Sequence, residues 1–215
     1  MQISIDDVYL TRAEREALAR DVHPLLLTRG PPGTHDLPLL DRLVKRLSTA
    51  GPDDETAIPD FDKRGDDRWP PARWRRVRGR PAAILIDAWL LGARAQSPAE
   101  LAAPINHLER REDSDGVWRG WVNDQLAGPY GDCFARFDAI VHLQAPSFDV
   151  VLDWRCEQEA DLLGVAPAEL PAAERARLAV FIQHYERITR HMLGGGVRAG
   201  ATVRLGADRS VREVL

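Results

Sequence analysis

The sequence has 215 residues, of which 44% are hydrophobic and 29% charged, with a formal net charge of −4. This composition excludes a disordered chain, and the absence of any running period excludes collagen and coiled coil. No apolar run approaches the roughly 20 residues that span a bilayer, and Asp6 and Asp7 interrupt the N-terminus too early for a signal peptide. Cys133 and Cys156 lack metal-ligand spacing, which predicts reduced thiols in a cytoplasmic protein.

The basic residues are unevenly divided, because 27 of the 29 are arginine and only Lys45 and Lys63 are lysine. Arginine grips carboxylates and phosphates well, but a genome rich in G and C produces the same bias. The negative net charge argues against a bulk attraction to nucleic acid. A run of five arginines around Trp74, within residues 73–80, is more typical of a solvated loop than of a nucleic-acid surface.

In the first half of the chain, residues 2–5 predict a short strand. Thr11 and Glu14 form a capping box for a helix that extends to about residue 21. Asp36, at the end of a turn-rich segment, can cap the next helix, which ends near Gly51. The apolar face predicted for that helix consists of Leu37, Leu40, Val44 and Leu47. Residues 52–80 are polar and rich in Pro, Asp and Arg, which predicts a long surface excursion.

In the second half, residues 82–86 and 139–143 are apolar runs that predict two buried parallel strands. Helices are predicted over 117–136, from Ser147 to about Leu163, and over a last long stretch that contains residues 178–188. A Pro-containing loop over 164–171 separates the last two helices. Residues 201–205 and 211–214 predict closing strands. The alternation of strands and helices predicts one α/β domain with a mostly parallel sheet.

Two of the predicted strands end in carboxylates, namely Asp6 with Asp7 after the first and Asp87 after the middle one. Functional sites of parallel sheets lie at the carboxyl ends of the strands. A carboxylate there can bind Mg²⁺ or accept a proton from a substrate hydroxyl, although a single such carboxylate more often caps a helix or a turn. Two at equivalent strand ends favour a site for phosphoryl transfer.

Five stretches, in order along the chain, carry a family resemblance. They are SIDDVYLT at 4–11, RGPPGTHD at 29–36, PDFDK at 59–63, IDAWLLGAR at 86–94 and FIQHYER at 181–187. Together they resemble the D-glycerate 3-kinase family, a branch of the P-loop kinases that includes uridine kinase, phosphoribulokinase and pantothenate kinase. The resemblance implies a three-layer α/β fold with a parallel sheet flanked by helices. It also implies ATP and Mg²⁺ as cofactors and D-glycerate or a similar small hydroxy acid as phosphate acceptor.

The resemblance further implies roles for individual residues. Asp6 matches the base that acts on the acceptor hydroxyl, and Tyr9 matches an aromatic residue near the acceptor. Asp87 stands where the family orients Mg²⁺, usually with Glu, so the shorter Asp implies contact through water. Arg155 resembles a lid arginine that closes over the phosphates near residues 155–171, although a solvent-exposed position is equally expected for it.

Other matched positions imply contacts with the acceptor. The residues implied by the substrate-side loops are Arg29, Thr34, His35, Asp36 and Lys63, among which cations can grip the substrate carboxylate. Tyr185, Arg187 and Arg190 lie on a helix that faces the acceptor in related kinases, and for them too the solvent-exposed alternative stays open.

The phosphate-binding Walker A motif, G-x-x-x-x-G-K-[ST], does not occur in the 215 residues. Lys45 lies inside a predicted helix, Lys63 follows Phe-Asp, and the glycines at 194–196 end a helix. In the family this loop precedes the position of Ser4, so the resemblance implies a fold that lacks its first strand, P-loop and first helix. We expect a sequence that starts late. The alternative is a gap filled by a partner's strand or a homodimer contact.

Two functions are consistent with these observations. The first is an ATP-dependent kinase of a small hydroxy acid, with little activity in residues 1–215 because the Walker A loop is missing. The alternative is a degenerate, non-catalytic kinase-like module that binds a small anion or a partner. The retained acceptor-side residues favour the first, and binding to a membrane or to nucleic acid is not expected from the composition.

Overall fold

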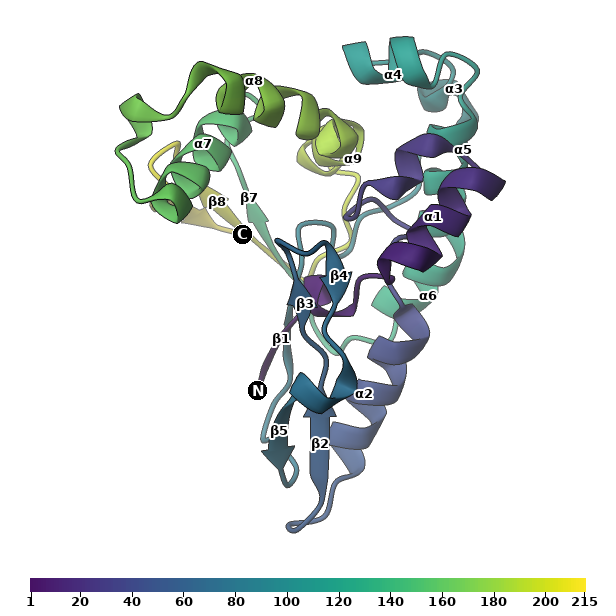
Figure 1. Cartoon of the computed structure of the whole chain (residues 1–215), viewed down its shortest axis with the longest axis vertical. Coiled ribbons are helices and arrows are strands. Elements are labelled where there is room, and N and C mark those ends of the chain that lie inside the picture. Colours follow the sequence, from purple (N-terminus) through teal and green to yellow (C-terminus); the bar gives the residue numbers. More distant parts are fainter. The chain divides into compact units, whose positions relative to one another are not determined.

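The computed structural model describes all residues 1–215. Its contacts divide the chain into two compact units (Figure 1), the first formed by Met1–Leu91 and Gly120–Arg136, the second by Gly92–Arg119 and Phe137–Leu215. Each unit has its own helices, strands and buried core. None of the helices has the length and apolar character needed to cross a bilayer.

Two of the helices of the first unit, α1 (Arg12–Asp21) and α2 (Leu37–Thr49), begin at the caps that the sequence predicts. The unit also contains α5 (Val117–Gln125) from residue 120 onward, and α6 (Gly131–Phe134). Thr11 and Glu14 form the predicted capping box of α1, and Asp36 Oδ1 accepts the Leu39 N–H of α2. On α2 the fully buried positions include Leu43, while Val44 is half-buried, so the apolar face is rotated slightly from the prediction.

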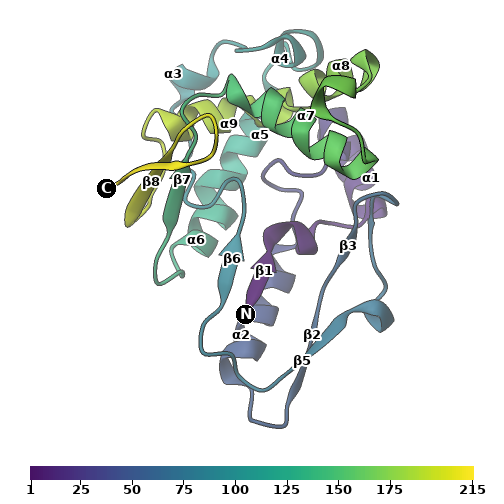
Figure 2. The ribbon, with the colours of Figure 1, turned by 90° about the vertical axis from the view of Figure 1, so that its left-hand side faces the viewer.

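Strand β1 (Gln2–Ser4) pairs in parallel with β6 (Leu85–Asp87), and the two lie side by side in Figure 2. The prediction of a parallel strand here is confirmed. The prediction that it is buried is wrong, because β6 has β1 as its only neighbour and the Leu85 side chain is 66% exposed.

Residues 52–80 are more regular than the predicted surface excursion. They contain two antiparallel pairs, β2 (Glu55–Ile58) with β5 (Arg75–Arg78), and β3 (Phe61–Asp62) with β4 (Asp67–Arg68). Ile58 and Phe61 point into the core, which explains why a polar segment is held in place. The arginines of β5 lie on a strand, and their side chains are exposed.

The second unit contains five helices and three strands. The helices are α3 (Pro98–Leu101), α4 (His107–Glu112), α7 (Val150–Leu163), α8 (Ala172–Phe181) and α9 (Gln183–Leu193). The predicted last long helix is therefore interrupted at Ile182, where the Tyr185 N–H bonds to the Ile182 carbonyl in a tight turn. Gly164, at φ 70°, ends α7 in the left-handed conformation.

The strands of this unit form a sheet in the order β7–β8–β9, namely β7 (Val141–Gln144), β8 (Ala201–Leu205) and β9 (Val211–Val214). The pairing is parallel between β7 and β8 and antiparallel between β8 and β9. The prediction of a buried strand near 139–143 is wrong in its burial, because Val141 and Leu143 are 56% and 64% exposed. β7 is an edge strand of this sheet, and the face that carries Val141 and Leu143 is exposed.

Candidate functional site

Asp6 lies in a 3₁₀ turn, Ile5–Val8, that follows β1 directly. The Ser4 hydroxyl accepts the Asp6 N–H, and the Asp7 carboxylate accepts the Ser4 N–H, so the turn is closed by its own side chains. Asp6 Oδ1 accepts a hydrogen bond from the Tyr9 hydroxyl at 2.7 Å, and Oδ2 pairs with Lys63 Nζ at 3.1 Å. Because its side chain is 27% exposed, Asp6 is a carboxylate that a solute can reach.

Tyr9 is held by a loop from elsewhere in the chain. It forms a backbone bridge with His35, and the two rings stack at 4.7 Å. Burial lowers the pKa of His35 to about 4, although Asp6 raises it slightly. His35 is therefore a neutral, interior ring at pH 7, and its contact with substrate stays a prediction.

The hydroxyl of Tyr130 fixes the His35 ring. This hydroxyl accepts the Gly33 N–H at 2.9 Å and lies 2.6 Å from His35 Nδ1. The ring nitrogen and the hydroxyl are thus joined by a hydrogen bond whose donor depends on the tautomer of His35. Tyr130 ends a π-helical turn, Leu126–Tyr130, that contains Pro129. Such turns are frequent at functional sites.

Thr34 and Asp36, two of the predicted substrate residues, organise this loop internally. Thr34 is fully buried, and its hydroxyl donates to the Pro31 carbonyl and accepts the Gly30 N–H. Asp36 caps α2 with one oxygen and pairs with Arg68 at 3.3 Å with the other. The polar atoms of both side chains have partners within the protein, and their contact with substrate stays a prediction.

The β3–β4 hairpin carries Lys63 to Asp6. The Lys63 side chain is 60% exposed, which leaves its ammonium accessible to a ligand. Arg29 donates one hydrogen bond to the Lys63 carbonyl at 3.2 Å and pairs through Nη1 with Asp66. Arg29 and Lys63, the two cations predicted on the substrate side, are therefore brought to the same hairpin.

Asp87 ends β6 opposite Ser4, so it lies at the same end of the β1–β6 pair as the turn that carries Asp6. It is exposed, and Oδ1 accepts a hydrogen bond from the Gln2 side-chain amide at 3.2 Å. An exposed carboxylate is a suitable magnesium ligand, but the structure contains no group of three or more His, Cys, Asp or Glu side chains arranged to hold a metal.

Arg155, Tyr185 and Arg190 belong to the second unit, whereas Asp6 belongs to the first. Arg155 is half-buried, pairs with Gln158, and lies with its guanidinium 5.8 Å from the centre of the Phe181 ring. Tyr185 contacts the same ring, and Arg190 pairs with Glu186 at 2.8 Å. Their action on a common substrate with Asp6 stays a prediction.

Arg187 is buried in a network of internal hydrogen bonds, and its contact with substrate stays a prediction. It forms a bidentate ion pair with Glu109, with both bonds at 2.7 Å, and also donates to the Glu100 and Ala103 carbonyls. The two charged side chains are 8% and 0% exposed. Since all of these donors are used inside the second unit, Arg187 stabilises the protein core.

Sequence reasoning missed three residues that position this site, namely Arg15, Asp66 and Tyr130. Arg15 is almost completely buried, a rare state for arginine that no local pattern predicts. For Tyr130 a signal was present, since Pro129 inside a predicted helix indicates an irregular turn. Asp66 follows Gly65 in a hairpin that was predicted only as part of a long loop.

No family model matches the sequence. A solved D-glycerate 3-kinase from Cryptococcus neoformans superposes with a TM-score of 0.76, over 100% of this chain and 79% of that chain, at 22% identity. The chain therefore has the α/β fold of a P-loop-type kinase, with a parallel sheet and flanking helices, as the resemblance implied.

Sequence relatives identify the family within that class. An "uncharacterized kinase mug58" of Schizosaccharomyces pombe is 30% identical over 166 residues, which are 74% of this chain and 58% of the relative. A chloroplastic D-glycerate 3-kinase of Arabidopsis thaliana is 32% identical over 169 residues, 73% of this chain and 34% of the relative. The chain belongs to the D-glycerate 3-kinase family, and its match spans about a third to just under three-fifths of these relatives' lengths.

Proposed function

We propose that the chain provides the acceptor-binding part of an ATP-dependent kinase that phosphorylates D-glycerate or a similar small hydroxy acid. The observation that carries this proposal is the carboxylate of Asp6 between the Tyr9 hydroxyl, at 2.7 Å, and the Lys63 ammonium, at 3.1 Å. A hydroxy acid presents a hydroxyl and a carboxylate within a few bonds of each other. A base beside an accessible cation matches both groups.

In this proposal Asp6 accepts the proton of the acceptor hydroxyl. Tyr9 donates to Asp6 Oδ1 and thereby orients the carboxylate, leaving Oδ2 for the substrate. Lys63, which occupies Oδ2 in the free protein, transfers its contact to the substrate carboxylate. The binding of the acid thus frees the base, and the contribution of these residues is positioning together with charge neutralisation.

Residues 1–215 contain a candidate ligand for Mg²⁺ but no motif that would bind the phosphates of ATP. Asp87 is an exposed oxygen ligand that can hold Mg²⁺, which supplies charge neutralisation to transferring phosphates when bound. No Walker A loop occurs in residues 1–215, so no side chain here is assigned to the phosphates of ATP.

The acceptor half of the proposal is tested with residues 1–215 as they stand, by titrating ¹⁵N-labelled protein with D-glycerate and with glycerol, which lacks the carboxylate. We expect D-glycerate to shift the Tyr9 and Lys63 amide resonances and glycerol to bind at least tenfold more weakly. Lys63→Met should lower the affinity for D-glycerate about tenfold, since a hydrogen bond between charged groups is worth about 1.5–3 kcal/mol. Lys45→Met, on the exposed side of α2, is the matched control.

Equal affinity for the two ligands, or an unchanged affinity in Lys63→Met, would contradict acceptor binding at this site. ADP release should be very slow when residues 1–215 are given MgATP and D-glycerate, since nothing assigned here holds the phosphates. In a protein that carries the phosphate-binding loop, Asp6→Asn should abolish turnover. An unaffected Asp6→Asn variant would favour the non-catalytic module instead.

A further inference from the structure

The contact between Lys63 and Asp6 depends on more than the two charges. Lys63 has a long, flexible side chain that is 60% exposed, and ion pairs of that kind are weak on their own. The two residues are separated by 57 positions in the sequence. For Lys63 Nζ to meet Asp6 Oδ2 reliably, the backbone at the tip of the β3–β4 hairpin has to be fixed by other groups.

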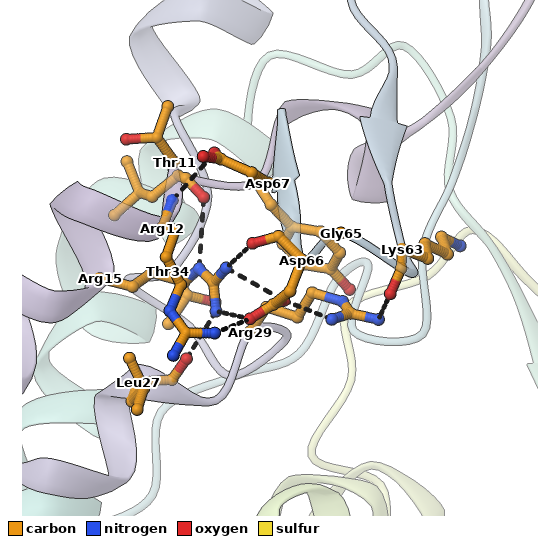
Figure 3. Close-up of polar contacts among 12 residues, drawn as sticks. Thr11, Arg12, Arg15, Leu27, Arg29, Thr34, Lys63, Gly65, Asp66 and Asp67 are labelled. Atoms are coloured by element: carbon orange, nitrogen blue, oxygen red, sulfur yellow. Dashed lines mark hydrogen bonds and ion pairs between the residues drawn. The ribbon is translucent and has the colours of Figure 1, made fainter. Parts of the chain in front are cut away.

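Three arginines converge on the hairpin tip at Asp66 (Figure 3). Arg12 and Arg15 contact the Asp66 carboxylate at 2.9 and 3.0 Å, and Arg29 pairs with it as well. Arg15 also donates to the Asp66 carbonyl at 2.6 Å and to the Leu27 carbonyl at 2.6 Å. Since the Arg15 side chain is only 1% exposed, it ties the hairpin tip to the core beneath α1.

The local backbone and charge state agree with a fixed tip. Asp66 adopts φ 56°, a left-handed turn conformation that Asp and Asn take more readily than other side chains. Burial acts to raise the pKa of Asp66, but the hydrogen bonds and charges of Arg29 and Arg15 outweigh it and lower the pKa below 3.8. Asp66 is therefore an anion at neutral pH and keeps all three arginines.

Arg29 connects this anchor to Lys63. One end of its guanidinium pairs with Asp66, and the other donates to the Lys63 carbonyl at 3.2 Å. We propose that Asp66 is a positioning residue, which holds the hairpin tip through Arg15 and Arg29 so that the Lys63 ammonium faces Asp6. The catalytic consequence rests on the proposed function, whereas the geometric statement does not.

Zero-length cross-linking tests the geometry without any need for activity. A carbodiimide activates a carboxylate, and a contacting amine then displaces the urea to form an amide bond. In the wild-type chain we expect an Asp6–Lys63 amide, detected by mass spectrometry of tryptic peptides. Asp66→Asn should lower its yield about fivefold, because asparagine accepts the left-handed backbone but removes the negative charge.

Asp67→Asn is the matched control. Asp67 lies next to Asp66 and accepts the Arg12 backbone N–H at 3.0 Å, a bond that an asparagine oxygen can keep. The yield of the Asp6–Lys63 cross-link in this variant should stay within twofold of the wild type. Amide formation at Lys45 in the same carbodiimide reaction should be equal in all variants. A second variant, Arg29→Gln, is needed if Asp66→Asn does not fold. It leaves Arg12 and Arg15 paired with Asp66 and should lower the yield of the Asp6–Lys63 cross-link about threefold.

An unchanged cross-link yield in Asp66→Asn or, if that variant does not fold, in Arg29→Gln would overturn the proposal. Ligand affinity provides the second readout, since Asp66→Asn should weaken D-glycerate about fivefold and leave glycerol unchanged. If Asp66→Asn lowers the cross-link yield but the wild-type chain does not bind D-glycerate, the positioning role is supported and the proposed function is contradicted. If the wild-type chain binds D-glycerate but Asp66→Asn leaves the cross-link yield unchanged, the proposed function is supported and the positioning role is contradicted.

Discussion

His35 shows how one buried ring can connect the site to the stability of the first unit. The ring is 5% exposed, stacks on Tyr9 at 4.7 Å, and shares a hydrogen bond with the Tyr130 hydroxyl. Protonation of the ring would place a charge in a buried position. Acid should therefore act on Tyr9, and through it on Asp6, by way of this ring.

The acid dependence of stability follows from the pKa of His35, which burial lowers from 6.5 to about 4. Between these values the unfolded chain binds the proton and the folded chain does not, so stability falls as the pH falls from about 6.5 to 4. His35 contributes at most about 3 kcal/mol to this loss. The imidazole resonance of His35 in a pH titration measures the pKa directly.

A variant separates His35 from the other buried histidines. Burial lowers the pKa of His142 and His184 too, so they add to the loss in the same direction. In His35→Phe, the difference in unfolding free energy between pH 7 and pH 4.5 should shrink relative to the wild type. A His35 resonance that titrates near pH 6.5 would contradict the buried, neutral ring.

At the scale of elements, local signals were sufficient for the starts of α1 and α2, whereas the helix predicted from Ser147 begins at Val150. The Thr11–Glu14 capping box and the Asp36 cap involve residues three positions apart, and both occur at the predicted places. The burial of β6 could not be predicted in this way, because it depends on which strands lie beside it. An apolar run is the same in a central strand and in an edge strand.

The same distinction applies to the candidate site. Asp6 and Lys63 were predicted as members of one site from the family resemblance, and the structure places them 3.1 Å apart. The groups that hold them lie far away in sequence, since Tyr130 contacts His35 across 95 positions and Arg15 contacts Asp66 across 51. No periodicity or cap signals such contacts.

Two glycines test how the loop at 29–36 is packed against α5. Gly33 has φ 94°, and a Cβ there would lie 2.2 Å from the Trp121 ring, whereas a Cβ on Gly120 meets nothing within 4 Å. Gly33→Ala should destabilise the protein by about 2 kcal/mol or more, through backbone strain and overpacking. Gly120→Ala should stabilise it by about 0.5–1 kcal/mol, because alanine favours the helix.

Urea unfolding at pH 7 measures both changes. The Gly33→Ala variant should also lose the hydrogen bond from the Gly33 N–H to Tyr130, visible as faster exchange of that amide. Equal stabilities of the two variants would mean that the loop tolerates a side chain at Gly33, and that its left-handed backbone does not position Tyr130.

At the scale of the whole molecule, a row of exposed apolar side chains crosses the sheet of β7, β8 and β9. Leu143 pairs with Val203 on β8, and Val203 pairs with Val214 on β9, so the three share one face of the sheet. Leu143 and Val214 are 64% and 67% exposed. Soluble proteins seldom leave such a row uncovered, which favours self-association through this face at high protein concentration.

Neighbouring side chains on β7 point to opposite faces of the sheet, so substitutions at two adjacent positions test that inference directly. Leu143→Lys should reduce self-association, measured by light scattering across a concentration series, and should change the unfolding free energy by no more than about 0.5 kcal/mol. His142 points to the opposite face and is 8% exposed, so His142→Lys buries a charge and should destabilise the protein by about 2–3 kcal/mol. If Leu143→Lys were the more damaging substitution, the Leu143 face would be the one that is packed. Because one register position separates the two residues, the pair reports which face of the sheet is open, independently of any assay of activity.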